Sequence, residues 1–179
     1  MRDEWDYVYR TEDLSRLEGP EYHTKRKEMK KATSRLEIQF EPVTPNRVRD
    51  CLALEETWCD VKDCSLDKFS AAEDAAMKEA LINFEQLGFL GCVLIVNGKL
   101  EALAVGERLN VDTAVVHFEK ANPGIRGLYQ VINQQFCERI LNSFEFVNHE
   151  QDVGDSDLRR AKEGYHPHHF VEKYWLPLP

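Results

Sequence analysis

The chain has 179 residues, of which 42% are hydrophobic, and a formal net charge of −9. This length and apolar content are enough for one hydrophobic core, so we expect one main folded domain. No apolar run approaches the ~20 residues of a transmembrane helix, and the N-terminus lacks the apolar segment of a signal peptide. We therefore expect a cytoplasmic protein with no transmembrane segment. Its five cysteines form no CxxC pair, which disfavours a disulfide framework or zinc ribbon.

The N-terminal segment, residues 1–36, has too few apolar residues for a core of its own. It contains an extended piece at Asp6–Tyr9, a loop through Leu17–Pro20 and a helix from about Tyr22. We expect an N-terminal arm here, followed by the main domain at 37–179. Six cations crowd the helix: Lys25, Arg26, Lys27, Lys30, Lys31 and Arg35. Two interpretations stay open, a solvated helix face, which is the usual fate of charge runs, and a contact for a polyanion such as tRNA.

The first elements of the main domain are predicted by local signals. Leu36–Phe40 alternates apolar and polar residues, which predicts a half-buried strand. Thr44-Pro45 supplies an N-cap and a first-turn proline for a helix to about Cys59. Ser70–Glu73 has the form of a capping box, which predicts a second helix that ends at Gly88.

Three strands are expected next. Phe89–Val96 and Leu100–Arg108 flank Asn97-Gly98, the dipeptide most typical of a two-residue hairpin turn, because both turn positions need a positive φ. Thr113–Glu119 is rich in residues that favour strands. These segments predict an antiparallel meander.

The C-terminal part alternates helices and strands. We expect a helix from about Ile125 to Leu141, a strand at Phe144–Val147, a helix at Ser156–Glu163 and a last strand at Phe170–Leu176. The predicted order from residue 36 is therefore β-α-α-β-β-β-α-β-α-β, which indicates an α/β (α+β) fold.

This order resembles the GCN5-related N-acetyltransferase (GNAT) fold, a mixed, mostly antiparallel sheet with helices on both faces. The resemblance implies that the fourth and fifth strands splay apart around an acyl donor. It also implies a glycine-rich loop whose N–H groups bind the donor's pyrophosphate at a helix N-terminus. The corresponding residues here are Asn122, Gly124, Arg126 and Gly127, with spacing that differs from the family pattern. The alternative is an ordinary proline-glycine turn before a helix.

A second resemblance covers nearly the whole chain. It rests on the segments DYVYRTEDL at 6–14, GPEYHTKRK at 19–27, VNHEQDVG at 147–154 and LRRAK at 158–162. They are similar to the DUF2156 family, which is similar to the C-terminal domain of phosphatidylglycerol lysyltransferase. The resemblance implies a transferase, which in the best understood relatives passes an aminoacyl group from aminoacyl-tRNA to a membrane lipid. Fuller members carry two tandem GNAT-like domains, so residues 1–36 would be the remnant of an inter-domain connection.

Acyl transfer to an amine or hydroxyl needs a base for the acceptor, an oxyanion donor and an acid for the leaving group. We predict Glu119, at the end of a strand, as the base, with Glu150 and Asp152 as alternatives. The GNAT resemblance implies Tyr165 as the acid. The groups that could hold a phosphate or a tRNA end are Arg126, Arg159, Arg160 and Lys162. The alternatives are structural, with carboxylates capping helices or pairing with arginines and Tyr165 packing in the core.

Three hypotheses of function follow. The first is an acyl or aminoacyl transferase that uses a CoA thioester or aminoacyl-tRNA as donor and a small molecule or lipid as acceptor. The second is a non-catalytic GNAT-like module that binds RNA or protein, and the third is a structural or regulatory subunit that pairs with a second copy of itself or with a partner. No metal is expected, because Pro167 interrupts His166, His168 and His169 and no further ligands lie at a usual spacing.

Overall fold

The computed structural model describes the backbone of residues 1–62 and 68–176 and the side chains of 1–56 and 72–176. One mixed sheet holds seven strands in the order β2-β3-β4-β5-β6-β1-β7. The strands are β1 (Asp6–Arg10), β2 (Ile38–Pro42), β3 (Leu90–Val96), β4 (Lys99–Arg108), β5 (Thr113–Ala121), β6 (Phe146–Asn148) and β7 (His169–Val171). All neighbouring strands pair antiparallel except β5 and β6, which pair parallel.

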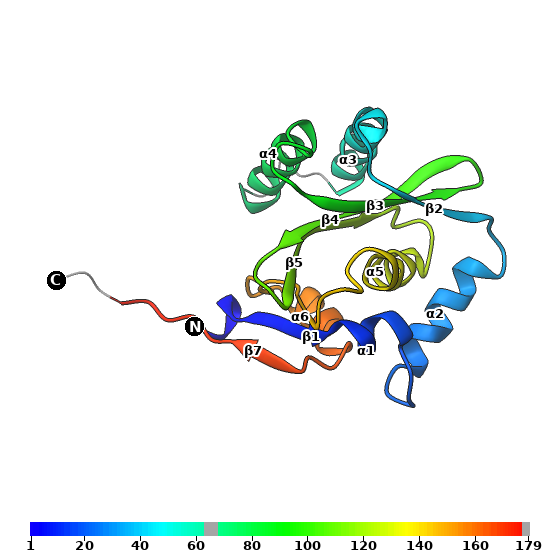
Figure 1. Ribbon diagram of the computed structural model, residues 1–179. Coiled ribbons are helices and arrows are strands. Elements are labelled where there is room, and N and C mark those ends of the chain that lie inside the picture. The colour runs from blue at the N-terminus through cyan, green and yellow to red at the C-terminus, as the bar shows by residue number, and fades with distance from the viewer. Residues whose placement is uncertain (63–67, 177–179) are drawn as a thin grey trace.

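The helices are α1 (Thr11–Arg16), α2 (His23–Thr33), α3 (Val48–Lys62), α4 (Lys68–Ile82), α5 (Leu128–Arg139) and α6 (Ser156–Glu163), with 3-10 turns η1 (Arg2–Glu4) and η2 (Pro45–Arg47). In Figure 1, α3 and α4 lie on one side of β3 and β4, and α5 lies on the other side. The core is divided accordingly into two apolar clusters, one around α5 and one beneath α3 and α4. No helix in the described ranges is long and apolar enough to span a membrane.

Several elements form where local signals predict them. The hairpin between β3 and β4 turns at Asn97 and Gly98, which have φ values of 50° and 84°. Helix α6 spans the predicted residues, and Asp155 caps it by accepting hydrogen bonds from the backbone N–H groups of Asp157 and Leu158. The α/β class with a GNAT-like arrangement of helices on both faces of a mixed sheet is confirmed.

The ends of three elements differ from the predictions. Helix α4 begins before Ser70 and ends at Ile82 instead of Gly88. Helix α5 begins at Leu128 instead of Ile125, because Gly127 has a φ of 93° and is not helical. Strand β7 ends at Val171, which pairs with Asp6, the first residue of β1, so residues 172–176 lie beyond the end of their partner strand.

The largest difference concerns residues 6–10. We expected them to belong to an N-terminal arm, and in the structure they form β1, which pairs with both β6 and β7. The side chains of Tyr7 and Tyr9 are 0% and 2% exposed and lie in the cluster around α5. The segment has too few apolar residues for a core of its own because it completes the core of the main domain.

Candidate functional site

The parallel strands β5 and β6 pair over a short distance and then separate. Their register begins at Thr113↔Phe146 and ends at Val115↔Asn148. Strand β5 continues to Ala121, whereas the chain after β6 turns away through Glu150, which has a φ of 56°. The second half of β5 is therefore free of a parallel neighbour, as the GNAT resemblance implied.

A β-bulge in β5 sets the direction of the side chains in this second half. Val105 pairs with Phe118 and Gly106 pairs with Val116, so His117 is an extra residue in β5. Before the bulge, Val116 packs in the α5 cluster, while after it Glu119 faces α5. Without the extra residue the alternation of the strand would turn Glu119 towards α3 and α4.

The residues at the bulge explain why it forms. A Cβ atom at Gly106 would lie 2.2 Å from the carbonyl oxygen of Val115, so only glycine fits there. The ring of His117 lies between two carboxylates, with Nε2 3.0 Å from Glu107 and Nδ1 3.0 Å from Glu150. The hydrogen bond to Glu150 raises the pKa of His117 above its ordinary value. His117 therefore joins β4 and β5 to the turn that follows β6.

Glu119 is a half-buried carboxyl group in the second half of β5. It accepts a hydrogen bond of 3.1 Å from Nδ2 of Asn133 on α5. Desolvation raises its pKa to about 7, against the opposing effects of Asn133, Lys162 and Lys25. Asn133 is 3% exposed, and its Oδ1 has no hydrogen-bond partner among the described residues. A buried amide with an unused acceptor thus lies next to a carboxyl that changes its charge near neutral pH.

His149 lies on the β6 side of the same region. Its Nε2 is 3.5 Å from Nδ2 of Asn133, and its ring makes an edge contact with Tyr9 at 5.2 Å between centroids. Burial lowers the pKa of His149 to about 3, so the ring is neutral at physiological pH. The hydroxyl of Tyr9 donates to the carbonyl oxygen of Lys162 at 2.9 Å, which ties β1 to α6.

Two lysines from distant parts of the chain, Lys25 and Lys162, act electrostatically on Glu119 and oppose the rise of its pKa. Nζ of Lys162 donates to the carbonyl oxygens of His149 and Gln151, both at 2.6 Å. Nζ of Lys25 on α2 donates to the carbonyl oxygen of Ala161 at 3.1 Å. Burial lowers the pKa of each lysine to about 8.

Tyr165, which follows α6, lies in the same neighbourhood. Burial raises the pKa of its hydroxyl well above 10.0, and the negative charge of Glu119 acts in the same direction. Nζ of Lys25 lies 3.7 Å from the centre of the Tyr165 ring. Of the residues predicted from the sequence, the structure thus brings Glu119, Lys162 and Tyr165 together.

Asp152 is placed differently. Its side chain is fully buried and accepts hydrogen bonds from the hydroxyl of Tyr7 at 2.6 Å and from Nε of Arg159 at 2.8 Å. The backbone N–H of Gly154 donates to its other oxygen. These donors, Arg159 first, lower the pKa of Asp152. This carboxylate and Arg159 therefore hold α6 against the sheet in this structure.

Glu150 and Arg160 also have partners within the chain. The carboxylate of Glu150 contacts His117, and its backbone N–H donates to Oδ1 of Asn148 at 2.7 Å. Arg160 is exposed and pairs with Asp157 on its own helix. Among the described residues, neither the Glu150 nor the Arg160 side chain forms a hydrogen bond or ion pair with Glu119.

The loop between β5 and α5 is covered by α2. Oδ1 of Asn122 accepts a hydrogen bond from the backbone N–H of Gly124. Arg126 makes two hydrogen bonds to the carboxylate of Glu28, at 2.6 and 3.1 Å. A Cβ atom at Gly127 would lie 2.1 Å from the carbonyl oxygen of Glu28. In this structure α2 therefore occupies the space next to the N-terminus of α5, where the GNAT resemblance implied a pyrophosphate.

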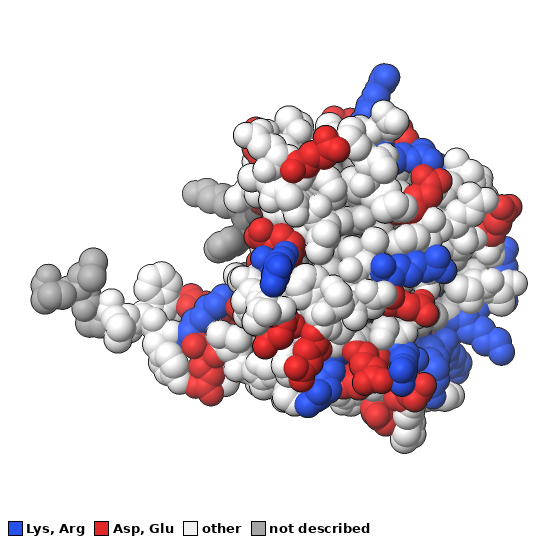
Figure 2. Space-filling model, viewed as in Figure 1, with Lys and Arg blue, Asp and Glu red and all other residues white. Residues whose placement is uncertain are grey.

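Some basic side chains in the stretch from Lys25 to Arg35 already have partners within the chain. Arg26 donates to the carbonyl oxygens of Leu17 and Gly19, and Lys31 pairs with Glu28. Exposed cations remain at Lys27, Lys30 and Arg35. On the face shown in Figure 2, basic and acidic side chains are interspersed.

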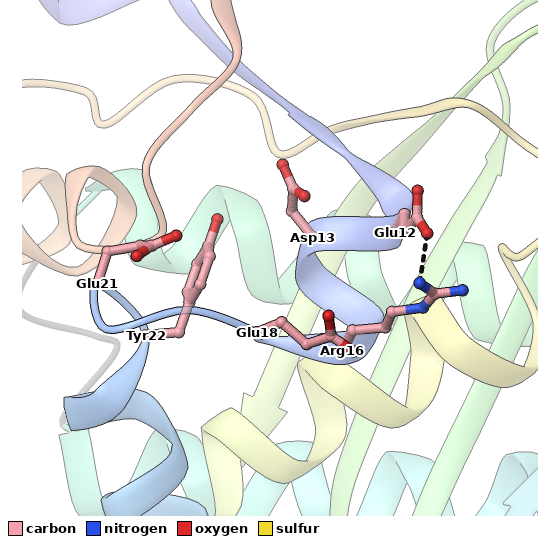
Figure 3. Close-up of a pocket in the computed structure, with 6 residues that line it drawn as sticks. All are labelled: Glu12, Asp13, Arg16, Glu18, Glu21 and Tyr22. Atoms are coloured by element: carbon pink, nitrogen blue, oxygen red, sulfur yellow. Dashed lines mark ion pairs between the residues drawn. The ribbon is translucent and has the colours of Figure 1, made fainter.

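A pocket of about 150 Å³ lies beside α1 and the loop to α2 (Figure 3). Its lining residues are Glu12, Asp13, Arg16, Glu18, Glu21 and Tyr22. None of them was predicted as a site residue, but the hydroxyl of Tyr22 donates to the carbonyl oxygen of Tyr165. In the described part of the chain, no three His, Cys, Asp or Glu side chains are grouped to hold a metal ion.

Three residues near Glu119 were missed by the sequence analysis as site residues: Lys25, Asn133 and His149. Two signals were available. Asn133 lies one helical turn before the buried Cys137, so a polar side chain was to be expected on an inward side of α5. Gly106 lies inside a strand, where glycine often marks a bulge. The contact of Lys25 with Tyr165 joins residues far apart in the chain and has no local signal.

Comparisons with known proteins give the family and the fold. The family model "Phosphatidylglycerol lysyltransferase, C-terminal" matches residues 1–176. No curated protein matches the chain. A conserved protein of unknown function from Bacteroides thetaiotaomicron has a TM-score of 0.91 and 38% identity, over 94% of this chain and 57% of that one.

Two more distant structures support the fold. The C-terminal domain (DUF2156) of a putative lysylphosphatidylglycerol synthetase from Agrobacterium fabrum has a TM-score of 0.65 at 16% identity, over 95% of this chain and 58% of that one. A GCN5-related N-acetyltransferase from Ralstonia eutropha has a TM-score of 0.51 at 16% identity, over 79% of this chain and 99% of that one. This chain thus spans less than two thirds of the Bacteroides and Agrobacterium structures. By the match over residues 1–176, the chain belongs to the family of phosphatidylglycerol lysyltransferase C-terminal domains.

Proposed function

We propose that the chain is an aminoacyl transferase that moves an aminoacyl group from aminoacyl-tRNA to a hydroxyl or amine acceptor, with Glu119 as general base. The observation that carries this proposal is the carboxyl of Glu119, which faces α5 beyond the paired part of β5 and β6. The family and the fold support the acyltransferase class.

The ionisation of Glu119 suits a general base. With a pKa of about 7, the carboxyl is ionised in a large fraction of molecules at neutral pH and still binds a proton well. Its hydrogen bond from Asn133 orients one oxygen, and the neutral ring of His149 adds no competing positive charge. Glu119 can therefore accept the proton that an acceptor hydroxyl or amine loses on attack.

The contacts of α2 favour an aminoacyl ester over a CoA thioester as the donor. CoA carries a pyrophosphate, and at the N-terminus of α5 this group would compete with Glu28 for Arg126 and meet the backbone of α2 at Gly127. The 3′ end of tRNA carries no pyrophosphate and does not need that loop. Lys27 and Lys30 on α2 and Arg35 just after it are exposed and suit phosphodiester contacts.

The family's description suggests which substrates to test first. Lysyl-tRNA labelled in the lysyl group is incubated with the purified chain and vesicles containing phosphatidylglycerol, and labelled lipid is measured. Acetyl-CoA with a panel of primary amines is tested in parallel. We expect transfer from lysyl-tRNA only, and a loss of roughly 10²-fold or more in Glu119→Gln, because the general base is removed.

The matched control is Glu145→Gln, which changes an exposed carboxylate just before β6. It should retain full activity. Transfer that survives in Glu119→Gln would remove Glu119 from the mechanism. Turnover of acetyl-CoA would contradict the choice of donor. If no group is transferred from any donor, the non-catalytic binding module would be favoured.

A further inference from the structure

Lys25 and Lys162 are similar in burial and pKa but differ in how many of their N–H donors are used. The ammonium of Lys162 has three backbone acceptors, His149 and Gln151 at 2.6 Å and Glu150 at 3.4 Å. An ammonium has three N–H groups, so Lys162 has none left for a ligand. Its role in this structure is to hold the turn after β6.

Lys25 uses fewer of its N–H donors than Lys162 does. Its ammonium makes one hydrogen bond, to the carbonyl oxygen of Ala161, and one contact with the ring face of Tyr165. Within the described residues it has no third acceptor. The carbonyl groups at the end of α6 and the aromatic ring both stabilise a cation, so the ammonium is fixed in place while one N–H stays available.

The surroundings of Lys25 leave room for its amine beside the end of α6. A Cβ atom at Gly164 would lie 3.3 Å from Nζ, so the absence of a side chain there gives the amine its space. Glu119 is the charged group that acts on Lys25, and it opposes the lowering of the lysine pKa by burial. The lysine on α2 and the carboxyl group on β5 are thus both partly desolvated, and each is within range of the other's charge.

We propose that Lys25 is a second catalytic residue, which protonates the leaving oxygen of the aminoacyl ester. This inference rests on the proposed function. It replaces the role that the GNAT resemblance implied for Tyr165, whose hydroxyl is a much weaker acid in this environment.

The reaction balances with these two groups alone. The acceptor O–H or N–H gives its proton to the carboxylate of Glu119, and the acceptor atom forms a bond to the acyl carbon. The ester C–O bond breaks, and the leaving ribose oxygen takes a proton from the ammonium of Lys25. Glu119 then releases its proton and Lys25 regains one, so both groups return to their initial states without a further reactant.

The test uses two donors that differ in what the leaving group needs. The ribose oxygen of lysyl-tRNA must be protonated as it leaves, whereas the nitrophenolate of lysine p-nitrophenyl ester leaves as a stable anion. Rates with both donors are measured for the full chain and for Lys25→Met, Lys25→Arg and Lys99→Met. The last variant is the control, because Lys99 is 70% exposed at the start of β4. Thermal unfolding followed by circular dichroism verifies that each variant is folded.

We expect Lys25→Met to lose roughly 10²-fold in rate with lysyl-tRNA and to stay within about threefold of the wild type with the nitrophenyl ester. Lys25→Arg should be as slow as Lys25→Met with lysyl-tRNA, because a guanidinium cannot give up a proton near neutral pH. The wild-type rate should also fall above pH 8 as Lys25 loses its proton.

Equal losses with both donors would show that Lys25 only supports the structure and would overturn the proposal while leaving the proposed function intact. Full rescue by arginine would reduce its role to electrostatic stabilisation and exclude proton donation. If the wild type transfers lysine from neither donor, the proposed function fails and the role of Lys25 fails with it.

Discussion

Replacing Glu119 with glutamine should stabilise the protein at alkaline pH and have little effect in acid. The carboxylate is held in a desolvated position, which is unfavourable for its charged form. Glutamine is nearly the same shape, keeps an acceptor for Asn133 and carries no charge. The variant therefore removes the cost of a buried charge and leaves the packing in place.

The size of the effect follows from linkage. The pKa of Glu119 rises from 4.5 to about 7 on folding. Below pH 4.5 both folded and unfolded states are protonated, so the raised pKa costs nothing. Above pH 7 both are ionised, and at ~1.36 kcal/mol for each pKa unit the folded state is destabilised by about 3 kcal/mol. Wild-type stability should thus fall as the pH rises from 4.5 to 7.

Urea unfolding at pH 5 and pH 8 measures this difference directly. We expect Glu119→Gln to exceed the wild type by ~1 kcal/mol or less at pH 5 and by about 3 kcal/mol at pH 8. Glu145→Gln should show no such dependence on pH. If Glu119→Gln and the wild type differ equally at both pH values, the carboxyl is not desolvated and the basis for its role as general base is lost.

Two further substitutions test the contacts around the site. Gly127→Ala should lower the free energy of unfolding by about 3 kcal/mol, because its Cβ would meet the backbone of Glu28. Gly98→Ala, with a similar φ and open space, should cost only about 1 kcal/mol, and equal urea midpoints for the two variants would contradict the packing of α2. Asp152→Asn should cost about 2 kcal/mol at pH 7, because the buried hydroxyl of Tyr7 loses a charged acceptor. A change below 0.5 kcal/mol in its urea unfolding would show that this contact does not hold α6.

Local sequence signals predicted those turns and helix ends that a few adjacent residues determine. Asn97-Gly98 fixes the β3–β4 turn because both positions need a positive φ, and Asp155 fixes the start of α6 because its carboxylate caps two N–H groups. The alternation of helix and strand in the C-terminal part then gives the order of elements. The fold class could be predicted on this basis.

The placement of β1 could not be predicted in the same way. Its partners are β6 and β7, which begin more than 130 residues later in the chain. Asp6–Arg10 contains two tyrosines and one valine, a composition that suits an exposed arm as well as a strand. The packing of these tyrosines in the cluster around α5 decides the outcome, and that cluster is built mostly from residues far away in the chain.

The position of Glu119 shows how a local irregularity decides the chemistry of a site. Its place near the end of a strand is visible in the sequence, but the face of the sheet it takes depends on one extra residue, His117. Gly106, inside the neighbouring strand, was the available signal for that bulge. A regular strand of the same composition would have turned the carboxyl away from α5, Asn133 and Lys25.

The N-terminal arm, residues 1–36, makes two different contributions to the candidate site through α2. Helix α2 presents Glu28 to Arg126 and its backbone to Gly127, so it fills the position that a pyrophosphate would take in an acetyltransferase of this fold. One turn earlier on the same helix, Lys25 reaches Tyr165 and the end of α6. In the proposed function, the packing of α2 thus disfavours CoA as donor and supplies Lys25 as the proton donor. Because one helix makes both sets of contacts, the proposed choice of donor and the proposed role of Lys25 depend on the same packing of α2.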